Sequence, residues 1–88
     1  MPTRIITHDI SGGDWVELNI WVDVISSNVA AIRYNINEKQ LFVRFHHGGE
    51  YCYFNVYPQV ALEMYQCPSM GKFVAWRLRK SYIYEKVS

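Results

Sequence analysis

The sequence predicts an α+β domain, in which a small antiparallel β-meander of roughly three to five strands, able to curl over itself, precedes two short α-helices. Three observations predict this fold. Apolar residues alternate with polar ones early in the chain, turn-forming residues divide its middle into short apolar segments, and apolar residues follow helical spacing after Pro58. The chain has 88 residues, half of them apolar, which suits one compact domain over residues 1–88 and leaves too little for a second.

The first third of the chain carries the clearest strand pattern. The apolar residues at alternate positions are Val16, Leu18, Ile20, Val22 and Val24. This is the period of a strand with one buried face. Residues 4–10 are a candidate partner strand. The stretch Ser11-Gly12-Gly13-Asp14 supplies residues that tolerate positive φ, so we expect a tight reversal between the two strands.

Three further strands are expected in the middle of the chain, over residues 29–34, 41–45 and 51–56. The first two are separated by Asn35-Ile36-Asn37-Glu38, whose short polar side chains favour a turn. The last two flank the loop His46-His47-Gly48-Gly49. Together these segments predict an antiparallel meander.

Two helices are expected after the meander. Pro58 suits the first turn of a helix, where its missing N–H costs nothing, and Pro68 ends that helix. Ser69 is a suitable N-cap for the second helix. The expected inward stripes are Val60, Met64 and Cys67 in the first helix and Met70, Val74 and Leu78 in the second. Residues 82–87 are expected to form a short final strand.

The predicted hairpin of residues 41–56 places aromatic residues beside a cation. With a four-residue loop, in which Phe45 pairs with Glu50, one face would carry Phe42, Arg44, Tyr51 and Tyr53. The opposite face would carry Leu41, Val43, Cys52 and Phe54. Rings beside arginine suit single-stranded nucleic acid, because bases stack on the rings and guanidinium groups meet phosphates. Tyrosines also suit the core of a small sheet covered on both faces, and both interpretations remain open.

Positive charge is concentrated near the C-terminus. The net charge is only +1, but five of the nine basic residues lie in the last twenty positions. The arc of the second helix opposite its apolar stripe carries Lys72, Trp76, Arg79 and Lys80. This arc has no acidic member and includes a tryptophan, which is typical of a surface that contacts a polyanion, although a solvated helix face is the simpler interpretation.

A set of short motifs occurs in a fixed order between residues 22 and 84. They are Val24-x-Ser26-Ser27-Asn28-Val29, Ile32-x-Tyr34, Leu41-x-Val43-x-Phe45, Gly48-Gly49-x-Tyr51-x-Tyr53-Phe54, Pro68-Ser69-x-Gly71-Lys72-Phe73 and Arg79-Lys80-x-Tyr82. In this order they resemble the KTSC domain, a small module named for its place at the C-terminus of some lysyl-tRNA synthetases. The domain also occurs as a free-standing bacterial or phage protein.

The resemblance implies a meander followed by helices, with residues 22–84 as the KTSC-like core and residues 1–21 as a strand-forming N-terminal extension. It also implies RNA or other nucleic-acid binding, with Tyr51 and Tyr53 at the family's central Tyr-x-Tyr motif. Two residues depart from the family pattern. Arg33 stands where glycine is usual, and Pro58 falls one position later than the usual proline.

Other chemistry is not expected from this sequence. Adjacent histidines on a loop, and two cysteines separated by fourteen residues, match no common zinc spacing, so neither a metal nor a disulfide is predicted. The sequence contains no phosphate-binding glycine loop, no Cys-His pair and no paired carboxylates, so neither a cofactor nor a catalytic site is predicted. The N-terminus lacks the apolar segment of a secretory signal, and we expect a cytoplasmic protein without membrane contact.

The sequence therefore predicts a non-catalytic module that binds RNA or single-stranded DNA. The residues expected to bind are Phe42, Arg44, Tyr51, Tyr53, Lys72, Trp76, Arg79 and Lys80. The alternative is a protein-interaction module, encoded by a phage or mobile element, which acts as a homodimer and buries its aromatic surfaces against a second chain.

Overall fold

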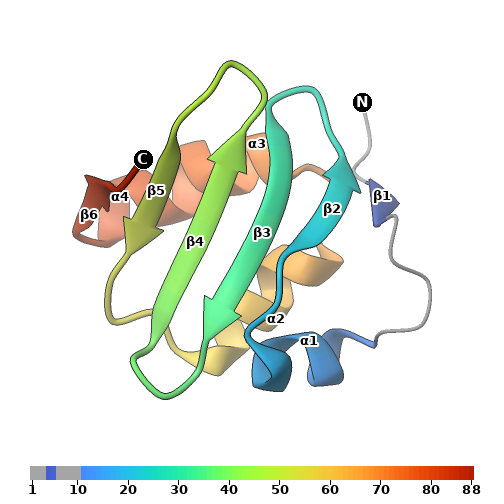
Figure 1. Ribbon diagram of the computed structural model, residues 1–88, viewed down its shortest axis with the longest axis vertical. Helices are drawn as coiled ribbons and strands as arrows, with labels where there is room; N and C mark the ends of the chain where they lie inside the picture. The colour runs from blue at the N-terminus through green and yellow to red at the C-terminus, as the bar shows by residue number, and fades with distance from the viewer. Residues whose placement is uncertain (1–3, 6–10) are drawn as a thin grey trace.

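The computed structural model describes residues 4–5 and 11–88. Within these ranges an antiparallel sheet follows chain order, each strand pairing with the next (Figure 1). The strands are β1 (Arg4–Ile5), β2 (Val22–Ile25), β3 (Val29–Asn35), β4 (Gln40–Phe45), β5 (Glu50–Tyr53) and β6 (Tyr84–Lys86). The α+β class and the antiparallel meander predicted from the sequence are confirmed.

The helices lie on one face of the sheet (Figure 1). They are α1 (Gly12–Leu18), α2 (Pro58–Gln66) and a continuous last helix made of α3 (Met70–Phe73), the wide π turn η1 (Val74–Leu78) and α4 (Arg79–Ser81). In the described part of the chain no helix covers the other face, which we call the open face. The molecule therefore has two layers, a sheet and a layer of helices (Figure 1).

The strand predicted over residues 16–24 is wrong in its first half, because residues 12–18 form a helix. Ser11 caps this helix, and its side-chain oxygen accepts a hydrogen bond from the backbone N–H of Asp14 at 3.2 Å. The reversal expected at residues 11–14 is instead made by Asn19, which has a left-handed backbone (φ 52°) at the helix C-terminus.

The side chain of Trp15 explains why helix prevails over strand in this segment. Trp15 is completely buried and packs against two rings, with centroid distances of 6.3 Å to Tyr34 and 5.3 Å to Tyr65. This contact with the core outweighs the local alternation of apolar residues. The strand prediction holds for residues 22–24, and β1 pairs antiparallel with β2 as expected. The rest of the predicted partner strand, residues 6–10, lies outside the described residues.

The other predicted elements are present, although the strand predicted over residues 51–56 ends at Tyr53 and Cys67 of the first predicted stripe lies just after α2, only partly buried. Asn35 forms the turn between β3 and β4, because its side-chain oxygen accepts hydrogen bonds from the N–H groups of Asn37 and Glu38. Pro58 lies in the first turn of α2, and Ser69 caps the last helix by accepting from the N–H of Lys72. The predicted stripe of the last helix is buried: Met70, Val74 and Leu78.

The core lies between the sheet and the helices. Its largest fully buried side chains include Trp15, Ile32, Tyr34, Leu41, Tyr53, Met64, Met70 and Leu78. The hydroxyl of Tyr34 donates a hydrogen bond to the carbonyl of Val56, which ties β3 to the segment before α2. A buried hydroxyl needs such a partner, so this bond fixes how α2 enters the helical layer.

Candidate functional site

The β4–β5 hairpin has a different register from the one predicted. Val43 pairs with Tyr51 and Leu41 pairs with Tyr53, so both tyrosines share a face with apolar residues of β4. The loop is shorter by one residue, since the N–H of Phe45 bonds to the carbonyl of Gly49. Gly48 and Gly49, with φ of 96° and 95°, allow this tight return. A shift of one residue reverses the face of every side chain on the returning strand, and the predicted pairing is therefore wrong.

As a result, Phe42 and Arg44 lie on the open face, away from the two tyrosines. They belong to a set that we call the open-face ladder: Trp21, Arg33, Phe42, Arg44 and Glu50. The Arg33 guanidinium lies 4.0 Å from the Phe42 ring centroid and 5.4 Å from that of Trp21. The Arg44 guanidinium lies 4.1 Å from the Trp21 centroid, and one of its nitrogens is 2.8 Å from a Glu50 oxygen. The cations of the open face are already stacked or paired within the protein.

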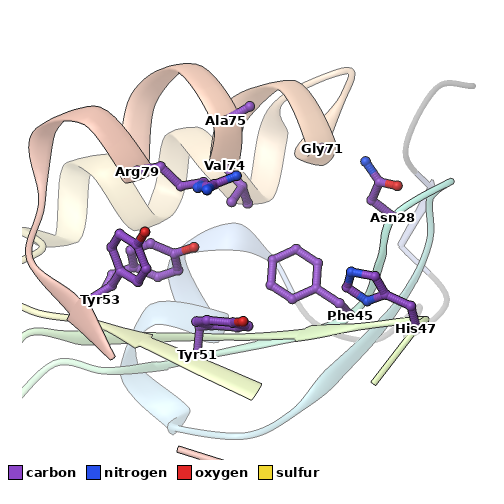
Figure 2. A pocket seen from close by; sticks show the side chains of 10 residues that line it. Asn28, Phe45, His47, Tyr51, Tyr53, Gly71, Val74, Ala75 and Arg79 are labelled. Atoms are coloured by element: carbon purple, nitrogen blue, oxygen red, sulfur yellow. The ribbon is translucent and has the colours of Figure 1, made fainter. Parts of the chain in front are cut away.

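A hollow lies on the other side of the sheet, under the last helix, with a volume of about 360 Å³. We call it the groove. Its walls are Asn28, Phe45, His47, Tyr51, Tyr53, Gly71, Val74, Ala75, Arg79 and Tyr84. Figure 2 shows the aromatic side chains rising from the sheet, with Val74, Ala75 and Arg79 above them on the helix.

Aromatic rings form the sheet side of the groove. Phe45 and Tyr51 meet edge to face at 5.6 Å between centroids, with planes at 79°, and Tyr84 of β6 lies 5.3 Å from Tyr53. Tyr51 is partly exposed, whereas Tyr53 is 1% exposed and closes the inner end. Burial raises the pKa of Tyr53 to about 12, and the nearby positive charge of Arg79 acts in the opposite direction. Tyr53 is therefore a neutral wall of the groove at physiological pH.

The π turn in the last helix positions Arg79. The backbone N–H of Arg79 donates to the carbonyl of Val74, five residues earlier, so this turn holds one residue more than an α-helical turn. The sequence-based prediction assumed a regular α-helical period and therefore placed Arg79 opposite the buried stripe that contains Val74. The structure places both residues on the walls of the groove, while Arg79 remains exposed to solvent.

Two loops close the other end of the groove. His46 joins them, because its Nε2 lies 2.8 Å from the carbonyl of Ser26 and its backbone N–H donates to the carbonyl of Asn28. This docking brings the side chains of Asn28 and His47 to the end of the groove (Figure 2). A Cβ at Gly71 would lie 3.1 Å from Asn28 Nδ2, so the helix and the Asn28 side chain approach closely here.

The carboxylates of β5 and β6 lie on the open face, and the lysine of β6 lies on the groove face. Lys86 pairs with Tyr51 and shares its face, whereas Glu85 pairs with Cys52 and Glu50 with Arg44 on the open face. No acidic side chain is among the described residues that line the groove. Within the part of the chain that the structure describes, Arg79 and Lys86 form no ion pair. The groove is therefore an aromatic hollow beside unpaired cations.

The residues predicted to bind fall into three places. Tyr51, Tyr53 and Arg79 come together in the groove, and Phe42 and Arg44 lie on the open face. Lys72, Trp76 and Lys80 are exposed on the last helix, where the Lys80 ammonium lies 4.2 Å from the Trp76 ring centroid. Sequence reasoning missed Asn28, Phe45, His47, Tyr84 and Lys86. The alternation of Tyr84 and Lys86 in the final strand could have pointed to two of them.

Neither cysteine lines the groove. Burial raises the pKa of the Cys52 thiol to about 11, helped by the charge of Glu85 and opposed by that of Arg33. Burial also raises the pKa of Cys67, whose Sγ is hydrogen-bonded to the carbonyl of Met64.

Nowhere in the described chain do three or more His, Cys, Asp or Glu side chains form a cluster that could hold a metal ion. None of the helices in residues 11–88 has the length and apolar character needed to span a bilayer.

Comparison with known proteins identifies the fold and the family. The family model for the KTSC domain matches residues 25–82, which is more than half of the chain. The chain belongs to the KTSC domain family. A crystal structure of a KTSC domain protein from Yersinia pestis is similar to this KTSC domain with a TM-score of 0.75 and 22% sequence identity. The similarity covers 78% of this chain and 97% of that protein, and it shows a shared fold. No curated protein sequence matches this chain.

Proposed function

We propose that this KTSC domain is a non-catalytic module that binds single-stranded nucleic acid, RNA or DNA, through the groove. The observation that carries the proposal is the position of Arg79, an exposed guanidinium without an ion pair to any described residue, on a hollow walled by Phe45, Tyr51, Tyr53 and Tyr84. Bases stack on aromatic rings, and cations on the same surface neutralise the phosphates.

The cations next to this hollow support the same function. Lys86 is on the groove face of β6, and its Cε lies 3.5 Å from the position that a Cβ on Gly49 would occupy, beside Tyr51. Lys72 and Lys80 are exposed on the helix that carries Arg79. A strand that enters the groove would therefore meet Arg79 and Lys86, and no carboxylate among the described lining residues would repel it.

The open face is a weaker candidate, although it also combines rings with arginine. Its two guanidinium groups already stack on Phe42 and Trp21, and Arg44 is paired with Glu50. A phosphate would have to compete with the Glu50 carboxylate, and a base would have to displace a guanidinium from a ring. The groove offers both kinds of group without such competition.

The decisive experiment compares two arginines of the last helix, Arg79 and Arg77. Arg77 is held by a 2.7 Å ion pair to Glu63 of α2, so Arg77→Ala removes the same charge from the same helix and serves as the matched control. Fluorescence anisotropy with a labelled single-stranded oligonucleotide would give the affinity at several salt concentrations. We expect a log–log slope of about −2 to −3 for three or four neutralised phosphates.

Arg79→Ala should make the slope shallower by about 0.7, the loss of one phosphate contact, while Arg77→Ala should leave it unchanged. Equal effects of the two variants would place the interface elsewhere. No binding at low salt, or an affinity independent of salt, would refute nucleic-acid binding altogether.

The second candidate is a protein-interaction module that acts as a homodimer. It is favoured by apolar side chains that face solvent, since Trp76 is 66% exposed and Ile83 is 77% exposed. Sedimentation velocity separates the two functions. A stable dimer that excludes quenchers from Trp76, and that added oligonucleotide does not affect, would replace the nucleic-acid proposal with this one.

A further inference from the structure

The groove is small, and side chains stand at both of its ends. Tyr53 lies at one end, and Asn28 and His47 lie at the other (Figure 2). The Tyr84 ring lies 5.3 Å from that of Tyr53. Its volume of about 360 Å³ is near the lower end of the range of roughly 300–1,000 Å³ for pockets that hold one small molecule. A groove that tracks several stacked bases would be larger.

The rings of the groove are arranged for one flat group. Phe45 and Tyr51 stand almost perpendicular, at 79°, so a planar ligand that lies on one ring meets the other at its edge. Val74 points toward these rings from the helix, and Ala75, higher on the same helix, also lines the groove (Figure 2). Such a site holds a flat aromatic group between apolar surfaces and fixes its orientation.

Polar groups occur among the lining residues beside the rings and Val74: the hydroxyls of Tyr51, Tyr53 and Tyr84, and the side chains of Asn28, His47 and Arg79. The Asn28 amide offers a donor and an acceptor, and its side chain makes no hydrogen bond to the described residues. Arg79 lies on the helix side without an ion pair in the described ranges. A flat heterocycle with hydrogen-bonding edges, joined to an anionic phosphate, matches this distribution of groups.

We propose that the groove holds a single unstacked base of a single-stranded nucleic acid, with the base between the Phe45 and Tyr51 rings and the helix. The adjoining phosphate lies at Arg79, and the edge of the base faces Asn28. This inference rests on the function proposed above and makes it more specific. The protein binds one nucleotide unit at a time along the strand, and the bases on either side remain outside the groove.

The test uses short single-stranded DNA in which the bases are replaced by abasic sites. One oligonucleotide is entirely abasic, a second carries one internal thymine, a third carries two adjacent thymines, and a fourth carries thymine throughout. One base should raise the affinity of the wild-type protein about tenfold over the abasic backbone, a factor typical of one stacked base. The second base should add little beyond the twofold gain expected from having two positions to bind.

Ala75→Trp tests the location of the site. Ala75 is exposed and lines the groove, so a tryptophan there would occupy the slot without changing any charge. This variant should lose the gain from the single thymine and keep the affinity and salt slope for the abasic backbone. Gln59→Trp is the control, because it adds the same ring at an exposed position of α2, and it should behave as wild type. Circular dichroism confirms that both variants are folded.

The outcomes separate this inference from the function on which it rests. Wild-type protein that binds none of the four oligonucleotides refutes nucleic-acid binding itself. Binding in which each added base contributes equally refutes the single-base groove and leaves nucleic-acid binding intact. Thymidine 5′-monophosphate should compete only weakly. Competition as strong as that of the one-thymine strand would overturn the assignment to a strand and indicate a free nucleotide as the ligand.

Discussion

The open-face ladder should act as a structural device, and Trp21→Ala tests this. The Trp21 ring is contacted by two guanidinium groups, Arg44 at 4.1 Å and Arg33 at 5.4 Å, and its side chain is partly buried. Each cation–π contact is worth about 0.5–1 kcal/mol, and burial of part of the ring adds about 1 kcal/mol. The substitution should therefore lower the free energy of unfolding by about 2–3 kcal/mol, or the melting temperature by roughly 10–20 °C.

The measurement is urea unfolding followed by far-ultraviolet circular dichroism, with the change read from the transition midpoint at constant slope. Trp76→Ala is the matched control. Its ring is 66% exposed and meets one lysine at 4.2 Å, so its loss should cost less than about 0.5 kcal/mol. Equal costs for the two tryptophans would refute the reasoning. In folded Trp21→Ala protein, oligonucleotide affinity should stay unchanged, because the ladder and the groove lie on opposite faces.

Three further predictions concern stability. Burial raises the pKa of Cys52 from 9 to about 11 and the pKa of Tyr53 from 10 to about 12. The stabilisation that the two protonated groups provide is therefore complete below pH 9 and is lost as the pH rises through the folded pKa values. The Tyr53 part is on the order of 2 kcal/mol, and Tyr53→Phe should remove it from the pH dependence of the unfolding free energy. Tyr34→Phe leaves the carbonyl of Val56 without its donor, so the free energy of unfolding measured in urea should fall by about 1–3 kcal/mol. An unchanged midpoint would mean that another donor replaces the hydroxyl. Gly48→Ala should lower the free energy of unfolding by about 1–2 kcal/mol in the same assay, because the glycine has φ of 96°. A Cβ at this position meets no atom within 4 Å, so the substitution measures backbone strain without a steric clash.

Local patterns predicted those parts of the fold where local and tertiary preferences agree. Pro58 and Ser69 mark helix starts by backbone chemistry that acts within a few residues, and both are found where the sequence placed them. The stripe of Met70, Val74 and Leu78 is buried as its spacing indicated. The prediction was wrong at residues 12–18, because alternating apolar residues fit a strand, while burial of Trp15 against Tyr34 and Tyr65 requires a helix.

The candidate site shows the same division. The sequence indicated the tyrosine pair and the cationic helix, and Tyr51, Tyr53 and Arg79 do meet in the groove. It misassigned the face of the tyrosines because one residue of loop length decides the register. It missed Asn28 and His47 because they belong to loops that are far apart in the chain and are joined through His46.

The amino-acid sequence by itself determined the kinds of side chain that this KTSC domain presents, the order of most of its elements and its membership of the family, because these depend on composition and on spacing along the chain. Only the tertiary structure decided which rings and charges share a surface. Strand register and the π turn each depend on a single residue of spacing, and both are set by packing between distant segments. One such residue separates Tyr51 from Arg44, and another helps to bring Arg79 to the groove.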